Sequence, residues 1–327
     1  MDLELAPHHQ AFRASMREFA QGVVEPHAAE VDRDHRFPEE AVAGAREAGL
    51  MGVLIPREYG GAGLDAIAFT LCIEELAQAC ASTAVIIDVH TSVGSEPILL
   101  FGTDEQKHQW LPRLASGELL GAFALTEPAS GSDAASLKTS ARRVGLRVGQ
   151  VFKKMGLNGS PTGELVLEDV VVPAANRLAA DGKGFPVAMR ALDSGRIGIS
   201  GQALGIAQAA VDQARDVLAA RPREQGDDFA LAEMATRLES ARLLAYRAAW
   251  LCASHRPFTR IASMAKLHCT DTAMDIALGA LQLAGEEGAI AGSPFERHMR
   301  DAKALQIYEG TNQVQRVVIS RDLVNAR

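Results

Sequence analysis

Aromatic residues and cysteine are scarce in this chain. Only 5% of its 327 residues are aromatic whereas 47% are hydrophobic, so a core must be built mainly from Ala, Leu, Val and Ile. That composition favours packed helices over an aromatic-rich sheet. The four cysteines have no CxxC or zinc spacing, which predicts buried free thiols rather than disulfides: they are Cys72, Cys80, Cys252 and Cys269.

The sequence also lacks an excess of basic residues, a signal peptide and a metal-binding histidine motif. It has 33 basic and 41 acidic residues and a net charge of −8, which argues against nucleic acid as its main partner. None of the nine histidines forms an HxxH or HExxH pair, so we expect no metal site. The N-terminus has no basic-then-apolar pattern, and we expect no membrane-spanning run. These absences predict a soluble cytoplasmic protein.

Apolar residues recur at helical spacing in both end regions of the chain. Up to residue 117, several stretches place an apolar residue at every third or fourth position, which is typical of amphipathic helices. From residue 184 onward the same spacing runs over longer stretches and predicts the helices of a bundle. One of these stretches has small residues that would allow close helix contacts: Gly198, Gly201 and Gly205.

The region between the two helical parts has a different pattern. Short segments within residues 118–180 alternate apolar and polar residues, as half-buried strands do. We expect three or four strands here, the first of them over residues 119–125. The predicted fold is therefore mainly α, with three domains: an N-terminal helical domain (1–117), a small β domain (118–180) and a C-terminal helical bundle (181–327).

One carboxylate stands at the junction of two apolar helical stretches. Glu309 lies between Tyr308 and Gly310, and the glycine interrupts the apolar pattern. A carboxylate at such a junction is poorly solvated, which raises its pKa and makes it a better base. A purely structural interpretation is also open, in which Glu309 precedes a helix that Thr311 or Asn312 caps.

Two other polar stretches allow both a functional and a structural interpretation. The stretch ALTEPASGSD places Thr126 and Ser132 among small residues after a predicted strand. Hydroxyls and free N–H groups in such a loop suit a phosphate or the edge of a cofactor ring, but an ordinary Ser/Gly turn explains them equally well. Asp193 and Arg196 lie three residues apart in a predicted helix, where an ion pair accounts for them without function.

Taken in order, five motifs closely resemble the acyl-CoA dehydrogenase family. They are TEPASGSD, KMGLNGSPTGELVLEDVVVP, GKGFPVAMRALDSGRIGISGQALGIAQAA, AEMATRLESARLLAYRAAW and MRDAKALQIYEGTNQVQR. The likeness covers nearly the whole chain and is greatest to the short-chain (butyryl-CoA type) members. It implies N-terminal helices, a central β-barrel, here reduced, and a C-terminal four-helix bundle, assembled as a homo-oligomer (tetramer or dimer).

The resemblance also implies ligands and a reaction. FAD and an acyl-CoA thioester are the family's ligands, and electron-transfer flavoprotein accepts the electrons in relatives. Glu309 matches the family's base, which takes the α-proton while the β-hydrogen leaves as a hydride to the flavin. Some relatives carry the base one residue before the arginine that matches Arg196. That residue is Gly195 here, which leaves Glu309 as the only candidate.

The same resemblance gives roles to further residues. Those expected to contact substrate are Ser132, Asp193, Arg196 and Gly310. Those expected to bind the flavin are Phe123, Leu125, Thr126, Ser132, Gln282, Gly285, Thr311 and Gln313. In relatives, the base's own backbone N–H and a flavin ribityl hydroxyl hold the thioester carbonyl as enolate character develops.

The sequence departs from the family at three places, all of them near the flavin. Only 21 residues separate Asp133 from Met155, whereas relatives have several dozen more, including a Trp-Ile-Thr/Ser motif. Residues 219–229 lack the family's Arg-x-x-Phe-Gly motif. Glu286 replaces the last glycine of the family's Gln-x-x-Gly-Gly, where it would add a negative charge near the FAD diphosphate.

These departures leave alternatives open. The chain is either a shortened homologue or a sequence with missing loops, which would show a break at Val144–Gly145 or between Ala219 and Asp228. The main prediction is a FAD-dependent dehydrogenase of a short-chain acyl-CoA. The alternative is a flavin-poor homologue that binds acyl-CoA, or a partner subunit, without dehydrogenase activity. A dehydratase or oxygen-using enzyme on the same fold is a third.

Overall fold

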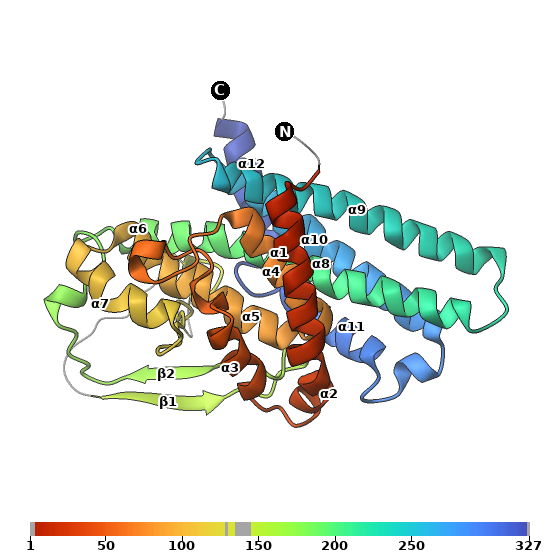
Figure 1. Cartoon of the computed structure of the whole chain (residues 1–327). Coiled ribbons are helices and arrows are strands. Elements are labelled where there is room, and N and C mark those ends of the chain that lie inside the picture. Colours follow the sequence, from red (N-terminus) through yellow and green to blue (C-terminus); the bar gives the residue numbers. More distant parts are fainter. Residues whose placement is uncertain (1–3, 128–129, 135–144, 326–327) are drawn as a thin grey trace.

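The computed structural model describes residues 4–127, 130–134 and 145–325. Figure 1 shows N-terminal helices packed beside long C-terminal helices, with a two-stranded sheet along one side. Helix accounts for 69% and strand for 4% of the structure. The prediction of a mainly α fold with a small β region is therefore confirmed.

The N-terminal helices surround an apolar core of their own. The first helical stretch is interrupted by a π-helical turn, after which Pro26 lies in the first turn of the next helix, where no N–H is needed. The helices are α1 (Pro7–Phe19), α2 (Glu25–Arg33), α3 (Glu39–Glu47), α4 (Ala66–Ala79), α5 (Ala81–Val89), α6 (Glu96–Phe101) and α7 (Asp104–Ala115).

One stretch of this core is long and apolar enough to cross a membrane, which differs from our expectation. It runs through α5, the π-helical turn His90–Ser95 and α6, from Ala81 to Phe101. In the structure 67% of an apolar 18-residue window of this stretch is buried inside the molecule. Length and composition alone do not distinguish a membrane span from such a core helix, and the burial favours a core helix.

His90 fixes the segment that follows α7. Its Nδ1 accepts a hydrogen bond from the Gly121 N–H at 2.9 Å, so Nε2 carries the proton and donates to the carbonyls of Met51 and Leu114, each at 3.1 Å. Burial lowers the pKa of His90, in agreement with this neutral form. His90 thus holds Gly121 in the middle of residues 119–125, which form no strand, so the strand predicted there is wrong.

The described part of the middle region contains two antiparallel strands, β1 (Leu146–Val151) and β2 (Gly163–Leu167), rather than three or four. Most of their side chains are exposed. The turn between them is inserted among the helices: the Leu157 N–H donates to Asp301 at 2.6 Å, and the Gly159 N–H donates to Ser82 at 3.1 Å. This turn anchors the small sheet to the helical body.

Long helices make up the C-terminal bundle, and α12 packs on its side against α10. The bounds are α8 (Gly184–Ala219), α9 (Gln225–Ala253), α10 (Thr259–Ala284), α11 (Pro294–Leu305) and α12 (Asn312–Asn325). Between Ala219 and Asp228, one of the two places where a break was suggested, residues 220–224 join α8 to α9 and lead into a capping box. The other suggested break, at Val144–Gly145, lies outside the described residues.

Helix α8 packs against the N-terminal helices along a row of glycines. A Cβ on Gly201 would lie 2.8 Å from the Thr70 carbonyl oxygen, and a Cβ on Gly205 would lie 2.6 Å from the Ala77 Cβ. Both distances are too short for real contacts, so only glycine permits this approach of α4. The prediction that these residues allow close helix contacts is confirmed.

Glu74 of α4 is fully buried and connects three helices. Its Oε1 accepts hydrogen bonds from Arg13 of α1 at 3.1 Å and from Arg242 of α9 at 3.0 Å. Its Oε2 accepts one from the Tyr246 hydroxyl at 2.6 Å. A single carboxylate therefore joins the N-terminal helices to the bundle.

The substitution Glu74→Ala should lower the free energy of unfolding by about 1–3 kcal/mol, because the Tyr246 hydroxyl loses its buried acceptor, whereas Arg13 keeps Glu75 and Arg242 keeps Glu239. Urea denaturation measures this loss. The control is Glu239→Ala, which removes an exposed carboxylate that also bonds Arg242, at 3.0 Å; its cost should stay below about 1 kcal/mol. Equal losses in the two variants would contradict the proposed importance of the buried contact.

Candidate active site

Glu309 lies in the loop between α11 and α12. The Thr311 hydroxyl accepts a hydrogen bond from the Val314 N–H at 3.3 Å, so Thr311 caps α12 as one interpretation of the sequence predicted. Glu309 and Gly310 both have positive φ, 51° and 85°. A residue with a Cβ pays about 1–2 kcal/mol for that conformation. The backbone therefore holds Glu309 in a strained turn, which is common at functional sites.

The Glu309 carboxylate rests on α8 at Gly195. A Cβ on Gly195 would lie 2.7 Å from the Glu309 Cδ and closer still to Oε2. Glu309 as a whole is half-buried, but its two carboxylate oxygens are inaccessible and have no hydrogen-bond partner among the described residues. Burial raises the pKa of Glu309 to about 7, although Arg196 and Lys266 lower it. A carboxylate with these properties can serve as a general base near neutral pH.

Two side chains hold the backbone of this loop. Lys266 of α10 donates to the Gly310 carbonyl at 2.9 Å. Gln315 of α12 donates to the same carbonyl at 2.9 Å and approaches that of Glu309 at 3.3 Å. The Glu309 N–H, by contrast, makes no hydrogen bond within the described part of the chain. It is available to donate to a ligand.

Helix α8 carries an ion pair beside Gly195. Arg196 donates to Asp193 at 2.5 Å, and Asp193 also accepts from Thr259 at 2.6 Å, so the predicted i, i+3 pair is confirmed. Both side chains are nearly inaccessible, and the Arg196 Nε has no partner among the described residues. Burial lowers the pKa of Arg196, while the negative charges of Asp193 and Glu309 raise it. The structure thus brings Asp193, Arg196, Glu309 and Gly310 together.

Sequence reasoning missed Asp88 of α5, a fully buried carboxyl near Glu309. Its Oδ1 accepts a hydrogen bond from Ser92 at 3.0 Å, while Oδ2 has no partner in the described structure. A Cβ on Gly198 would lie 2.7 Å from that Oδ2, so Asp88 and Glu309 pack against α8 one helical turn apart. Burial, and then the charge of Glu309, raise the pKa of Asp88 well above its usual range. The signal in the sequence that could have identified Asp88 is its position as a lone carboxylate within an apolar run.

Lys266 was also missed, although its position carried a signal. It falls at a core position of the helical spacing between Ala262 and Cys269, and it is fully buried. Burial lowers the pKa of Lys266 to about 7, while the charge of Glu309 raises it. A lysine in place of an apolar side chain indicates a special environment, but the sequence does not identify its partner.

The residues expected to bind the flavin fall into two groups. Phe123 and Leu125 are half-buried and pack with Ala191 and Leu192 of α8, next to the Asp193–Arg196 turn. Thr126, Ser132 and Gln313 are exposed, and Thr311 is half-buried.

The second group lies at the far end of α10. Gln282 is 16 residues from Lys266, which is about 24 Å along a helix. Gly285 follows α10 directly, and Glu286 beside it is exposed. One copy of the chain therefore does not bring Gln282 and Gly285 to the Glu309 loop.

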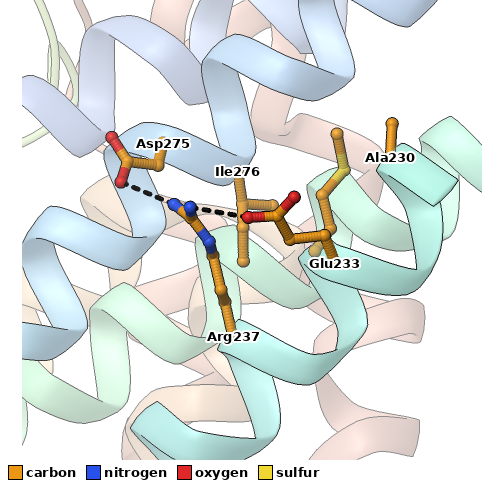
Figure 2. A pocket seen from close by; sticks show the side chains of 6 residues that line it. Ala230, Glu233, Arg237, Asp275 and Ile276 are labelled. Carbon is orange, nitrogen blue, oxygen red and sulfur yellow. Dashed lines mark hydrogen bonds and ion pairs between the residues drawn. The ribbon is translucent and has the colours of Figure 1, made fainter. Parts of the chain in front are cut away.

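A pocket on the surface between α9 and α10 lies apart from these residues (Figure 2). Arg237 bonds Glu233 at 2.7 Å and Asp275 at 3.0 Å, so one cation is shared by the two carboxylates of the pocket. Asp275 lies nine residues from Lys266, or about 14 Å along α10. None of the predicted site residues is among those that line it, which are Ala230, Glu233, Met234, Arg237, Asp275 and Ile276.

His8, His9 and Asp65 place potential metal ligands within 4.8 Å of one another. Asp65 caps α4, where it accepts a hydrogen bond from the Ala68 N–H at 2.9 Å, and both its oxygens lie 3.0 Å from His9 Nε2. These contacts explain the cluster as a helix cap with a histidine partner.

Comparisons with known proteins agree with the motif order. Residues 6–118 match the family model of the acyl-CoA dehydrogenase N-terminal domain, and residues 182–324 match that of the C-terminal domain. The chain is 39% identical to the short-chain specific acyl-CoA dehydrogenase of Clostridium acetobutylicum over 374 aligned positions, covering 98% of this chain and 99% of the relative. Because the alignment is longer than the 327 residues here, the relative has segments that this chain lacks.

Two solved structures have nearly the same fold. Butyryl-CoA dehydrogenase from Megasphaera elsdenii gives a TM-score of 0.96 at 34% identity, over 99% of this chain and 100% of that one. A chain in a structure of the electron transferring flavoprotein of Acidaminococcus fermentans gives 0.96 at 36% identity, with coverage of 99% and 100%. On these matches, the chain belongs to the acyl-CoA dehydrogenase family.

Proposed function

We propose that this chain is a FAD-dependent acyl-CoA dehydrogenase acting on a short-chain thioester, with Glu309 as its base. Its family consists of oxidoreductases that use FAD. The observation that carries the assignment of the base is the Glu309 carboxylate, whose two buried oxygens have no partner among the described residues. An α-proton of a bound thioester would supply the missing contact.

The α-C–H of a thioester is a weak acid, so the protein must also make its proton easier to remove. The Glu309 carboxylate takes the α-proton at one of its oxygens. The Glu309 N–H, which no described residue uses, donates to the thioester carbonyl as negative charge develops there. Lys266 and Gln315 restrain the loop, so the base and this donor, which belong to one residue, keep a fixed relative position.

FAD, when bound, accepts the β-hydrogen as a hydride. We assign Phe123, Leu125, Thr126 and Thr311 to the ring side of the cofactor, because they lie on or near α8 and the Glu309 loop. We further assign Ser132 and Gln313 to the flavin. Gln282 and Gly285 are about 24 Å away along α10 and would serve the FAD of a second copy, which supports a homo-oligomer.

Further roles follow from the family likeness. We propose that Ser132, Asp193, Arg196 and Gly310 contact the acyl-CoA substrate and that electron-transfer flavoprotein accepts the electrons. A cytoplasmic location and the division at residues 117 and 180 remain predictions.

The short middle region favours a second candidate function. The described residues there contain only two strands, and relatives have segments that this chain lacks. A flavin-poor homologue would retain α8 and the Glu309 loop and bind acyl-CoA without oxidising it. A visible absorption spectrum of the purified protein, recorded before and after addition of FAD, separates the two functions. Absence of flavin bands after reconstitution would exclude the dehydrogenase.

The variant Glu309→Gln keeps the size of the side chain but removes the base. We expect butyryl-CoA to reduce the flavin about 10²–10⁴-fold more slowly in this variant, while binding is retained. Stopped-flow absorbance measures the reduction, and Glu239→Gln, an exposed residue of α9, is the control. If Glu309→Gln bleaches the flavin at the normal rate, Glu309 is not the base.

The rate of flavin reduction should depend on pH with an acid limb near 7. Burial raises the pKa of Glu309 to about 7, so the carboxylate is protonated and inactive below this pH and ionised above it. The rate should therefore increase as the pH rises through 7. An acid limb at the ordinary glutamate value of 4.5 would mean that the carboxylate is solvated in the enzyme.

A methyl group at position 195 should displace the base. The variant Gly195→Ala places a Cβ where the Glu309 carboxylate lies, and a shift of about 1 Å can reduce the rate about 10²-fold. Gly184→Ala, also in α8 but with open space around its Cβ, should reduce the flavin at the normal rate. Circular dichroism checks that both variants are folded, and equal rates in the two would refute the proposed contact.

A further inference from the structure

Lys266 is a fully buried cation without a carboxylate in contact. Its Nζ donates to two neutral oxygens, the Gly310 carbonyl and the Asn312 side-chain oxygen, both at 2.9 Å. A buried ammonium that has only neutral acceptors is costly unless an opposite charge lies nearby. The role of Lys266 therefore depends on which negatively charged group lies near its ammonium.

Three charged groups face Lys266: Glu309 from the loop, Arg196 from α8 and Asp271 from its own helix. The charge of Arg196 is already compensated by Asp193 at 2.5 Å. Asp271 accepts hydrogen bonds from the side-chain amides of Gln306 and Asn312, both at 2.7 Å. The carboxylate that has no partner of its own among the described residues is that of Glu309. Glu309 is faced in turn by Arg196, Lys266, Asp88 of α5 and the neighbouring Tyr308.

We propose that Lys266 is a positioning residue for Glu309, which holds the peptide after the base and supplies the buried positive charge that keeps its carboxylate ionised. The inference rests on the proposed role of Glu309 as base. Lys266 and Glu309 share no hydrogen bond, so the attraction between them acts through space. The carboxylate oxygens thus remain free for the substrate proton.

A positive charge in direct contact with Glu309 would weaken it as a base, which explains why Lys266 bonds the next peptide and not the carboxylate itself. A direct ion pair would stabilise the carboxylate further, lower its proton affinity and make it a weaker base. With Lys266 bonded to the Gly310 carbonyl, Glu309 and Lys266 both titrate near pH 7, so the carboxylate is partly ionised there and yet remains basic. Burial raises the pKa of Glu309 to about 7 while Arg196 and Lys266 lower it, in agreement with that balance.

The structure permits a test because the Gly310 carbonyl has a second donor. Without the ammonium, that carbonyl keeps Gln315 at 2.9 Å. The Asn312 oxygen lies 3.2 Å from the Thr270 hydroxyl, whose single proton also goes to the Lys266 carbonyl at 2.8 Å. The variant Lys266→Met removes the charge and fills similar space, and Lys266→Gln offers the Asn312 oxygen a neutral donor. The control is Lys303→Met, which removes an exposed lysine of α11.

The experiment measures the pH dependence of flavin reduction by butyryl-CoA in the holoenzyme and these variants. We expect the acid limb of Lys266→Met to move upward by about one pH unit, which makes reduction at pH 7 several-fold slower and restores it at higher pH. Lys303→Met should match the wild type. An infrared titration of the Glu309 carboxyl, assigned with Glu309→Gln, should show the same upward movement without turnover.

A second variant separates the charge from the hydrogen bond. Lys266→Gln keeps a donor but no charge, so it should move the acid limb as Lys266→Met does, and it still tests the charge if Lys266→Met does not fold. A rate deficit that is the same at every pH, or an unmoved acid limb, would overturn the proposed charge role. Normal reduction by Glu309→Gln would instead overturn the proposed function itself.

Discussion

The close approach that glycines allow on α8 is the constraint on which the site depends. At Gly201 and Gly205 it lets α4 of the N-terminal region pack directly against the helix. At Gly195 it makes room for the Glu309 carboxylate, and at Gly198 for that of Asp88. Because these positions belong to one helix, the packing that joins the two halves of the molecule also determines where the base can lie. The glycines of α8 therefore determine both how the two halves pack and where the site residues lie.

Burial gives this region its chemical character. Glu309, Asp88 and Lys266 lie within a few helical turns of one another, and burial raises the pKa of the two carboxyls and lowers that of the lysine. None of the three forms a direct ion pair with another in the described structure, so their charges are balanced through space. Uncompensated buried groups are usually a cost to folding. Their accumulation around one strained turn is more consistent with chemistry than with stability.

Sequence patterns predicted the parts of this structure that follow from local spacing. The long helices, the α8 glycines, the Asp193–Arg196 pair and the Thr311 cap all depend on residues a few positions apart. The segment 119–125 was misjudged, because alternation cannot tell whether a partner strand exists, and here His90 holds the segment instead. Asp88 and Lys266 were missed for a related reason: each looks like an isolated charge until the fold brings Glu309 beside it.

In the middle region, the contacts that position the Glu309 loop differ from the segments that would contact the flavin. The turn between β1 and β2 is kept between the helices, where Leu157 donates to Asp301 and the Met155 carbonyl accepts from Arg300 at 3.0 Å. Both partners belong to α11, which leads directly into the Glu309 loop. The part of the middle region that braces the base is therefore present, and the segments that relatives have in addition can differ without moving Glu309. A shortened member of the family can thus retain the geometry for proton abstraction, while its affinity for the flavin depends on other contacts.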